Sequence, residues 1–345
     1  MSPEHANSTP AAPPGPWVLA DIGGTNARFG WLPAGQQQPL HVATLAAADH
    51  AGPTAAARSY LAALAVTLGD GYQPPSAAAF AVATAVTGDS ISFTNSSWTL
   101  SRQAAQHALA LDDLRLMNDF EALALSLPRL TPAQWRPIGQ GGPLQPPPPA
   151  MGSAALAVVG PGTGLGVAGL APSPHGWVAV PGEGGHATLA AGDDFEWAVL
   201  SAARREHPHV SAERLLSGIG LPLLHQAVAA VLGHAAVAPL TAEQIVERAL
   251  KQHDPACERC VDTFCAMLGS FAGNVALMLG ARGGVYIGGG IVPRLGERFF
   301  ASRFRARFES KGRFQAYLQA VPTLLITDTL AALTGAAVAL EQPRT

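Results

Sequence analysis

Short apolar runs, separated by glycine-rich or polar turns, recur along this chain and predict buried β-strands. Longer stretches rich in Ala and Leu lie between them and predict helices, so that strands and helices alternate as in an open α/β sheet. The predicted strands are 17–20, 77–84, 114–117, 154–159, 167–170, 283–291 with its glycine turn, and 324–327. The predicted helices are 54–68, 120–127, 221–240, 241–250, 261–279 and 330–340, with a basic amphipathic segment at 299–314.

Two local features follow the strand at 77–84. A Thr-Gly-Asp turn at 87–89 predicts that residues 91–94 pair back on that strand. Trp98 precedes a predicted helix start at Ser101, after a polar loop at 95–97. A Trp at such a place is able to stack on a sugar ring, but packing against the helix is the favoured interpretation.

The first glycine turn joins the apolar run 17–20 to a second run at 27–31. Its glycines permit a β-hairpin in which backbone N–H groups and the Thr25 hydroxyl line a small concavity suited to phosphate oxygens. Asp21 at the strand end suits a hydrated Mg²⁺ ion beside that phosphate. An ordinary hairpin turn that bonds only its own backbone is the alternative. The candidate residues are Asp21, Gly23, Gly24, Thr25 and Asn26.

A second glycine turn, at 160–166, also joins two apolar runs. It lacks the Lys-Ser/Thr pair of a P-loop and the following helix of a dinucleotide fingerprint. Two Gly-Thr hairpins, one per domain, would clamp a triphosphate from both sides if they faced each other. A third glycine turn closes the run at 283–291, where backbone can approach a flat ligand such as adenine. The candidate residues are Gly162, Thr163, Gly164, Gly288, Gly289 and Gly290.

Asn118 and Asp119 end the predicted strand at 114–117, directly before a predicted helix. Ligands of open α/β sheets bind at such carboxyl ends of strands. There Asp119 can accept a hydroxyl proton, and Asn118 offers a donor and an acceptor to neighbouring hydroxyls. From the residues alone, a helix cap at Asp119 is the favoured alternative.

Three further polar residues are candidates for binding a polyol. Glu183 and His186 lie on a loop braced by three glycines, and loops of this kind often bind ligands. No third ligand with zinc-like spacing is near, so hydrogen bonding to hydroxyls is favoured over a metal site. Glu213 lies in the first turn of a helix predicted to begin after Ser211, where compensation of the helix dipole is the ordinary role of a Glu.

Composition narrows the class of protein. The chain has 345 residues, 48% hydrophobic and 13% charged, which is typical of a globular protein with two domains and a cleft between them. A net charge of -3 gives no basic field for nucleic acid or anionic membrane, so the basic segment is expected to be a solvated helix face or an intersubunit patch. No apolar run reaches the ~18 to 20 residues of a membrane span, and 221–240 comes closest.

The remaining features indicate a cytoplasmic protein. Cys257, Cys260 and Cys265 are expected to be ordinary thiols of an apolar helix in a reducing compartment. Residues 1–16 lack the apolar core of a secretory signal and are expected to be a disordered tail. The Pro- and Gly-rich stretch 131–150, with a polyproline insert at 143–150, is expected to be an exposed connector near a domain boundary.

Taken together, the motifs resemble the bacterial glucokinase family, the ATP-dependent branch of the actin-like sugar kinases that lacks a cysteine-rich zinc motif. The similarity runs from 19 to about 340 and departs from the family only in the Pro-rich tail and the polyproline insert. The matching motifs are Ala-Asp-Ile-Gly-Gly-Thr-Asn-Ala-Arg, Asn-Asp-Phe at 118–120, Gly-Thr-Gly-Leu-Gly-Val at 162–167, Pro-Gly-Glu-Gly-Gly-His, Ser-Ala-Glu-Arg-Leu-Leu-Ser-Gly and Ile-Gly-Gly-Gly-Ile-Val-Pro-Arg.

The resemblance implies an α/β, actin-like ATPase or ribonuclease-H-like fold, with two α/β domains flanking a nucleotide and sugar cleft that closes around substrate. It implies a small domain at 17–129 completed by a C-terminal helix at about 328–342, and a large domain at 130–327. It also implies a cytoplasmic homodimer.

The resemblance further implies transfer of the ATP γ-phosphate to O6 of D-glucose, with ATP and Mg²⁺ as cofactors. By similarity, Asp119 is the general base rather than a cap. The residues implied to hold the other sugar hydroxyls are Asn118, Glu183, His186 and Glu213.

Two alternatives remain open, and a third is disfavoured. In the first, the chain is a kinase of the same fold whose acceptor is another hexose, such as mannose, fructose, glucosamine or N-acetylmannosamine. In the second, it is a nucleotide- and sugar-binding module without transfer chemistry. A sugar-responsive repressor of the same fold would need a DNA-binding domain before the first hairpin, and 16 residues are too few for one.

Overall fold

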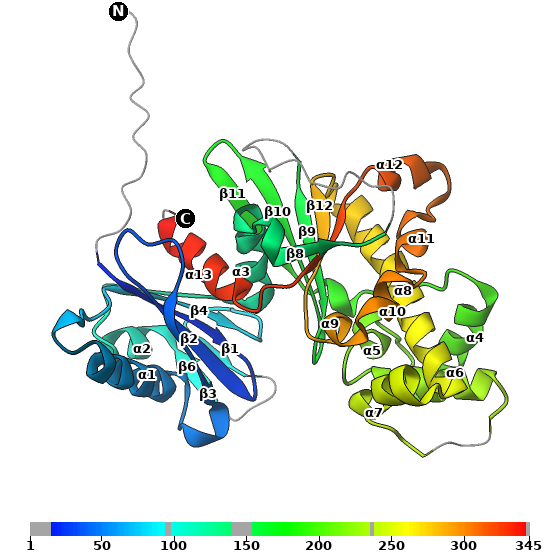
Figure 1. Cartoon of the computed structure of the whole chain (residues 1–345), viewed down its shortest axis with the longest axis horizontal. Coiled ribbons are helices and arrows are strands. Elements are labelled where there is room, and N and C mark those ends of the chain that lie inside the picture. Colours follow the sequence, from blue (N-terminus) through cyan, green and yellow to red (C-terminus); the bar gives the residue numbers. More distant parts are fainter. Residues whose placement is uncertain (1–14, 94–97, 140–153, 235–237, 343–345) are drawn as a thin grey trace, which may run out of the picture. The chain divides into compact units, whose positions relative to one another are not determined.

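The computed structural model describes residues 15–93, 98–139, 154–234 and 238–342. They form two compact units, one with residues up to 129 and from 330 onward, the other with residues 130–329 (Figure 1). The expected polar loop at 95–97, the polyproline insert at 143–150 and nearly all of the expected N-terminal tail lie outside the described residues.

The first unit is built on a five-stranded sheet in the order β3-β2-β1-β4-β7. Its strands are β1 (Trp17–Ile22), β2 (Asn26–Leu32), β3 (Leu40–Ala46), β4 (Ala77–Val82) and β7 (Asp113–Asn118). The hairpin strands are antiparallel, whereas β1, β4 and β7 are parallel, with Val82 in register with both Ile22 and Asn118. The carboxyl ends of the three parallel strands therefore lie level at one edge of the sheet.

Helices complete the first unit. They are α1 (Pro53–Leu68), α2 (Arg102–Ala108), α3 (Asp119–Ser126) and α13 (Ala331–Glu341). Tyr60 and Leu64 of α1 pack against the side chains of β1 and β4 in one core. The C-terminal α13, red in Figure 1, packs along α3 and against β4 and β1. A Cβ at Gly335 would overlap the carbonyl of Ala122, so α13 and α3 pack at backbone contact.

Two predictions for this unit were wrong. The described part of the segment 91–94, residues 91–93, does not pair with the strand at 77–84, because β5 (Ser90–Ser92) pairs instead with β6 (Thr99–Ser101). The edge strand β3 was missed, because its residues are mostly exposed and it carries no continuous apolar run. Trp98 packs as expected, buried at a 6.0 Å ring distance from Phe93.

The second unit repeats the strand order of the first. Its six-stranded sheet has the order β11-β10-β9-β12-β13-β8, with β9, β10 and β11 antiparallel and β9, β12 and β13 parallel. The added edge strand β8 pairs antiparallel with β13. The strands are β8 (Trp135–Pro137), β9 (Leu156–Pro161), β10 (Leu165–Ser173), β11 (Gly176–Gly182), β12 (Gly284–Ile287) and β13 (Thr323–Ile326).

The long helix α8 (Pro255–Leu279) is the core of the helical part of this unit. It is long and apolar enough to cross a membrane, so the expectation that no segment reaches that length was wrong, but 78% of its apolar window is buried inside the protein. Its three cysteines are buried free thiols, as expected. The neighbouring helices are α4 (Asp194–Ala203), α5 (Ala212–Leu215), α6 (Leu221–Val231), α7 (Ala242–Glu247), α9 (Ile291–Leu295), α10 (Glu297–Phe300), α11 (Phe304–Glu309) and α12 (Gln315–Gln319).

The basic segment at 299–314 is not one solvated helix. It breaks at 301–303, where the Ser302 hydroxyl accepts a hydrogen bond from the Phe304 N–H, and α11 begins there. Arg307 is buried because its guanidinium pairs with Glu196 at 2.6 Å. A further difference is that α6 ends at Val231 rather than continuing to 240.

Candidate functional site

The first glycine turn is a tight hairpin. The Gly23 N–H donates to the Asn26 carbonyl at 2.9 Å, which leaves Gly24 and Thr25 at the tip. Neither glycine has a positive φ, and a Cβ at Gly23 would come no closer than 3.5 Å to the Asn26 oxygen. Contact with the surrounding fold therefore does not require glycine at 23, and the missing side chain leaves the tip of the turn, at Gly24 and Thr25, open to a ligand.

Asp21 lies near the end of β1, opposite Arg28 in the hairpin register. Burial raises the pKa of Asp21, and the nearby positive charge of Arg28 acts in the opposite direction. The described residues contain no cluster of three or more His, Cys, Asp or Glu side chains suited to a metal ion. One carboxylate nevertheless fits a Mg²⁺ ion that takes its other ligands from water and substrate phosphates.

Asn118 and Asp119 lie at the junction of β7 and α3. The Asn118 Oδ1 accepts from the Phe120 N–H at 2.9 Å, and its Nδ2 donates to the Thr84 carbonyl at 3.3 Å. Asn118 is therefore the N-cap of α3, one residue before the cap that local sequence favoured at Asp119. The Asp119 Oδ1 nevertheless also accepts from the Phe120 N–H, at 2.9 Å. Asp119 is the first helical residue and half-buried, at the same sheet edge as the first glycine turn.

The second glycine turn, between β9 and β10, is held from two sides. The Gly162 N–H donates to the Gly164 carbonyl at 2.9 Å, and the Gly162 carbonyl accepts from the Gly218 N–H at 2.8 Å. A Cβ at Gly162 would meet nothing within 4 Å, so space is open there. Gly218 ends the Ser-Ala-Glu-Arg-Leu-Leu-Ser-Gly motif at 211–218, but its support of this turn was not predicted from the sequence.

Glu213 is fixed against this turn. Ser211 caps α5 through a bond from the Arg214 N–H, which sets Glu213 in the first turn as expected. Its Oε2 accepts from the Leu165 N–H at 2.8 Å, and a Cβ at Gly164 would overlap that oxygen. Gly164 is thus required by the position of the Glu213 carboxylate, which itself adjoins the candidate phosphate turn.

His186 is brought next to Glu213. Its Nε2 lies 3.8 Å from the Glu213 Oε1, and the two side chains are 61% and 24% exposed. Gly184 and Gly185 bring the loop close to β10, because a Cβ at Gly185 would overlap the Leu165 carbonyl. Glu183 is exposed on the same loop. Carboxylate and imidazole groups that face solvent beside a glycine turn can hold several hydroxyls of a polar ligand.

The third glycine turn follows β12. The Gly288 N–H donates to the Val159 carbonyl at 2.9 Å. Gly289 has a φ of 76°, and a Cβ there would overlap the Pro161 carbonyl. Gly290 would meet nothing within 4 Å. The second and third turns thus lie at one edge of the sheet. In these turns an added Cβ would meet nothing within 4 Å at Gly162 and at Gly290, so contact with the rest of the fold does not account for glycine there.

The family model described as Glucokinase matches residues 18–343. The "Glucokinase" of Paramagnetospirillum magneticum is 46% identical over 329 residues, 95% of this chain and 98% of that protein. The "Bifunctional protein glk" of Burkholderia thailandensis is 45% identical over 95% of this chain, which spans about half of that relative, 49% of its length.

Among solved structures, a glucokinase from an Antarctic psychrotroph superposes with a TM-score of 0.83 at 37% identity, covering 95% of this chain and 99% of that one. The fold is therefore the α/β actin-like ATPase fold, as the sequence motifs implied. With the family model matched across nearly the whole described chain, this protein belongs to the glucokinase family.

Proposed function

We propose that this protein transfers the γ-phosphate of ATP to O6 of D-glucose, giving glucose 6-phosphate and ADP. The observation that carries the proposal is similarity to a protein named glucokinase along 98% of that protein's length. The polar side chains beside the glycine turns support it, because a non-catalytic nucleotide-binding module has no need of hydroxyl ligands at that place.

Five polar residues are proposed to hold the glucose hydroxyls. They are Asn118, Asp119, Glu183, His186 and Glu213. Glu213 is the best supported of the second group, because the Leu165 N–H orients its carboxylate at 2.8 Å and its other oxygen is directed to the His186 side.

Asp119 is proposed as the general base. An alcohol is too weak an acid to ionise alone at neutral pH, so a positioned carboxylate must accept the O6 proton as O6 attacks the γ-phosphorus. The O6–P bond forms while the bond from phosphorus to the β,γ-bridging oxygen breaks, and ADP leaves. The position of Asp119 as the first residue of α3, at the end of β7, supports this role.

The glycine turns are proposed to bind ATP. The backbone N–H groups of Gly24 and Thr25, and those of Thr163 and Gly164, would stabilise charge on the phosphates, with Asn26 beside the first turn. Gly23 and Gly162 would shape these turns, since their own N–H groups bond within the turn. The turn at 288–290 would contact the adenine. A Mg²⁺ ion, held by Asp21 through water, would neutralise charge on the phosphates when bound.

The larger organisation is proposed from the resemblance. The two units would act as a small domain, 17–129 with 328–342, and a large domain, 130–327. We also propose that the protein is cytoplasmic and homodimeric, with no nucleic acid or membrane as a partner.

The test is a coupled assay of ADP release across a panel of hexoses, with glucose 6-phosphate detected by its dehydrogenase. Turnover should be greatest with glucose, and Asp119→Ala should lower kcat by about 10² to 10⁴ with only a modest change in KM for glucose. Asp112→Ala, an exposed carboxylate near the start of the same strand, is the matched control and should leave kcat unchanged.

Three outcomes would contradict parts of the proposal. Near-normal turnover by Asp119→Ala would exclude it as the base. Turnover only with another hexose would replace the substrate and keep the mechanism. No turnover with any of the sugars would favour a different phosphoryl donor or a binding module without transfer chemistry.

A further inference from the structure

A pocket of about 190 Å³ lies in the second unit, away from every residue proposed for catalysis. It is formed by the first turn of α4, one face of α8 and the segment 301–303 that follows α10. A water molecule occupies ~30 Å³ in the liquid, so the pocket has room for a small ion and several waters. No step of the proposed phosphoryl transfer uses it.

Glu196 is one of the residues that line this pocket, and its carboxylate is incompletely bonded. Its side chain is 2% exposed, and its Oε2 accepts from the Gly192 N–H at 2.7 Å and from the Arg307 guanidinium at 2.6 Å. Its Oε1 is buried and has no hydrogen-bond partner within the described part of the chain. A buried oxygen without a partner costs about 1–3 kcal/mol, so a donor is expected to occupy that position.

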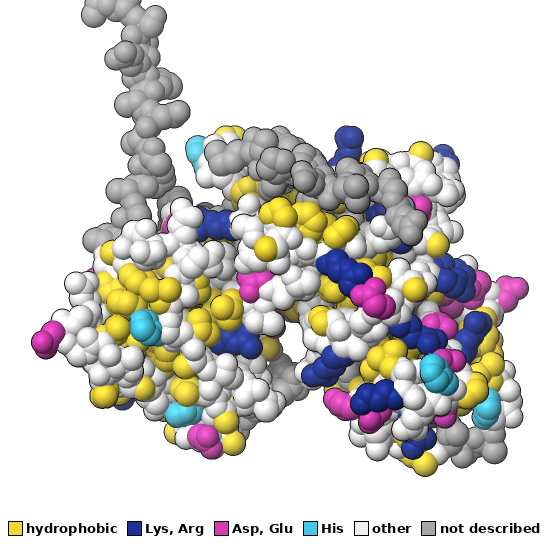
Figure 2. All heavy atoms as spheres, viewed as in Figure 1, with side chains coloured by type: hydrophobic (Ala, Val, Ile, Leu, Met, Phe, Trp, Pro, Cys, Tyr) yellow, Lys and Arg dark blue, Asp and Glu magenta, His cyan; other side chains and the backbone are white. Residues whose placement is uncertain are grey.

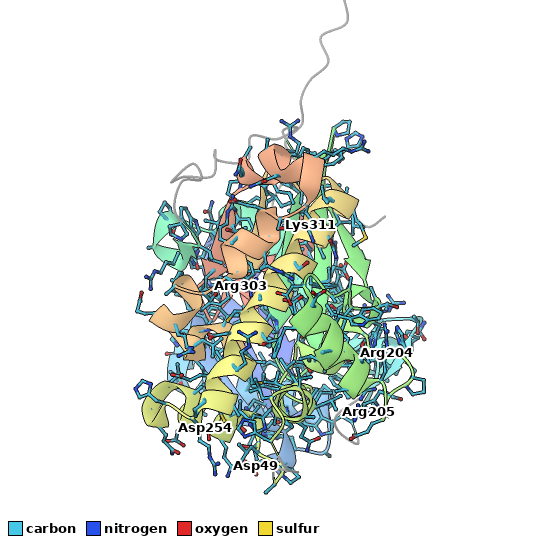
Figure 3. All side chains as sticks on the ribbon, turned by 90° about the vertical axis from the view of Figure 1, so that its right-hand side faces the viewer. Asp49, Arg204, Arg205, Asp254, Arg303 and Lys311 are labelled. Atoms are coloured by element: carbon cyan, nitrogen blue, oxygen red, sulfur yellow. The ribbon has the colours of Figure 1, made fainter. Side chains whose placement is uncertain are left out.

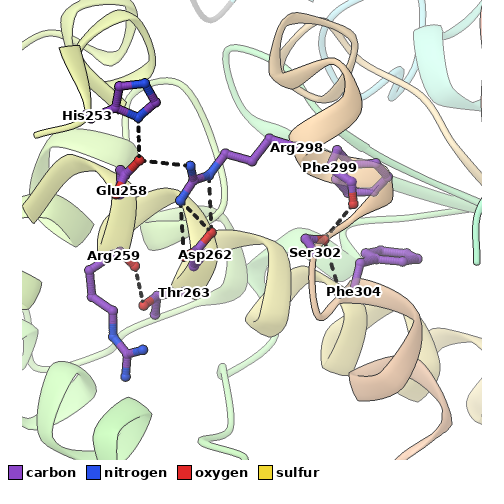
Figure 4. Close-up of polar contacts among 9 residues, drawn as sticks. All are labelled: His253, Glu258, Arg259, Asp262, Thr263, Arg298, Phe299, Ser302 and Phe304. Carbon is purple, nitrogen blue, oxygen red and sulfur yellow. Dashed lines mark hydrogen bonds and ion pairs between the residues drawn. The ribbon is translucent and has the colours of Figure 1, made fainter. Parts of the chain in front are cut away.

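Arg259 supplies an uncommitted positive charge to the same pocket. Its guanidinium lies 4.0 Å from the centroid of the Phe195 ring. In the described residues it makes no hydrogen bond or ion pair, and in Figure 4 it extends away from the neighbouring Arg298 network. Arg303, also lining the pocket, is held only by a 3.4 Å contact with Asp193.

The other polar lining groups already have partners. Asp262 is paired with Arg298 at 3.1 Å. The Thr263 hydroxyl donates to the Arg259 carbonyl at 2.7 Å, and the Ser302 hydroxyl donates to the Phe299 carbonyl at 2.6 Å (Figure 4). Asp193, which also lines the pocket, pairs with Arg303 and with Arg307, at 3.4 Å each. The pocket therefore presents the guanidinium groups of Arg259 and Arg303 beside carboxylates that already have cationic partners.

We propose that this pocket binds hydrogen phosphate, a tetrahedral oxyanion that keeps one P–OH group. Its charged oxygens would bond the guanidinium groups of Arg259 and Arg303, and its P–OH would donate to the Glu196 Oε1. This site is separate from the turns proposed to bind ATP. It would select hydrogen phosphate by the P–OH group that donates to Glu196, and not by charge alone.

Sulfate provides a sharp comparison, because it has the same shape but no hydroxyl. At about pH 8 both ions carry close to two negative charges, so a difference in affinity reports the bond to Glu196. The change is made in the ligand because removing Glu196 would leave Arg307 buried without its partner and destabilise the fold.

The experiment is isothermal titration calorimetry of the full chain with sodium phosphate and with sodium sulfate, at constant ionic strength. Phosphate should bind at least about tenfold more tightly than sulfate, and Arg259→Met should weaken phosphate about tenfold. Arg204→Met is the control, since Arg204 also lies over an aromatic ring, that of Trp197, but does not line the pocket. Figure 3 shows Arg204 and Arg303 on separate parts of this unit.

Three results would overturn the proposal. Equal binding of phosphate and sulfate would exclude the bond to Glu196. Phosphate binding that survives Arg259→Met, or falls equally in Arg204→Met, would place the ion elsewhere. Absence of phosphate binding by the wild-type chain would exclude the site altogether.

Discussion

Gly162 and Gly164 lie two residues apart in one turn, and they are glycine for different physical reasons. Gly164 faces the Glu213 carboxylate so closely that a Cβ would have to displace it, whereas Gly162 faces open space. Neither has a positive φ, so backbone strain explains neither of them. The first is required by the position of a proposed sugar ligand, and the second is left free for the proposed phosphates.

Alanine at these two positions should therefore affect different substrates. Gly162→Ala should raise KM for ATP about tenfold or more with little change in thermal stability, because its methyl group enters the space proposed for phosphate. Gly164→Ala should raise KM for glucose, because its methyl group displaces the end of the Glu213 side chain.

Steady-state kinetics with each substrate varied in turn, together with the Tm of each variant, measures this split. Gly182→Ala is a control in the same unit, with nothing within 4 Å of an added Cβ. Equal effects of the two turn variants on both KM values would contradict the separate roles.

At the scale of elements, the start of α3 depends on a helix more than 200 residues away. Gly335 of α13 lies at the Ala122 carbonyl of α3, and α13 also packs on β1 and β4. Arg129, three residues after the end of α3, forms an ion pair with Glu341, the last residue of α13. Because Asp119 begins α3, the packing of the C-terminal helix positions the proposed base.

Gly335→Ala should lower both stability and turnover. An added methyl group cannot be accommodated against backbone, so the helices must separate, at a cost of about 1–3 kcal/mol. We expect a lower urea midpoint and a reduced kcat. Gly71→Ala is the matched control in this unit, since a Cβ there meets nothing within 4 Å. A normal kcat in a destabilised Gly335→Ala would show that α13 does not position Asp119.

The N-terminus of α8 allows a test based on pH. Asp254 accepts a hydrogen bond from the Cys257 N–H at 2.9 Å, and that bond, foremost, holds the pKa of Asp254 below its ordinary value of 3.8. The ionised form is thus favoured in the folded state, and its stabilising effect is present above pH 3.8 and lost as pH falls through the folded pKa.

Asp254→Ala should accordingly lower the free energy of unfolding by about 1 kcal/mol at pH 7, and the deficit should shrink at about pH 3. Asp254→Asn keeps a capping oxygen and should recover most of the stability at pH 7. Urea unfolding followed by circular dichroism at both pH values measures the difference. If Asp254→Ala lowered the free energy of unfolding equally at the two pH values, the ionised carboxylate would not be the cause of the loss.

At the scale of the whole molecule, the two units share one strand order and one pattern of strand directions. In each unit a glycine turn joins two antiparallel strands, β1 to β2 and β9 to β10. The first strand of each hairpin also pairs with a parallel strand, β4 or β12, whose carboxyl end lies beside the turn. The repeated topology gives each unit its own glycine hairpin at the same place in its sheet. Figure 2 shows acidic, basic and apolar side chains interspersed over the visible face, which agrees with the small net charge.

The proposed homodimer has a direct measurement. Size-exclusion chromatography with light scattering should give a mass near twice the 35.4 kDa of one chain, unchanged over a tenfold dilution. A mass of one chain would remove the dimer from the proposal without affecting the proposed chemistry.

The sequence by itself determined the buried strands, several helices and the three glycine turns, because apolar runs and glycine act over a few neighbouring residues. Its ordered motifs also identified the family. It did not predict the exposed strand β3, whose pairing with β2 depends on hydrogen bonds rather than on burial. The short strand β8, within the expected connector, and the helix α4 were not predicted. Local reasoning also assigned the cap of α3 to Asp119 instead of Asn118.

Only the tertiary structure decided the contacts between distant segments. The bond from Leu165 to Glu213 and the burial of Arg307 against Glu196 join residues 48 and 111 positions apart. Such pairs leave no periodic signal, since a Glu in a first turn or an Arg in a basic helix has the same local pattern whether or not it is buried. The chain specified the elements locally, and the packing of those elements decided which charges meet.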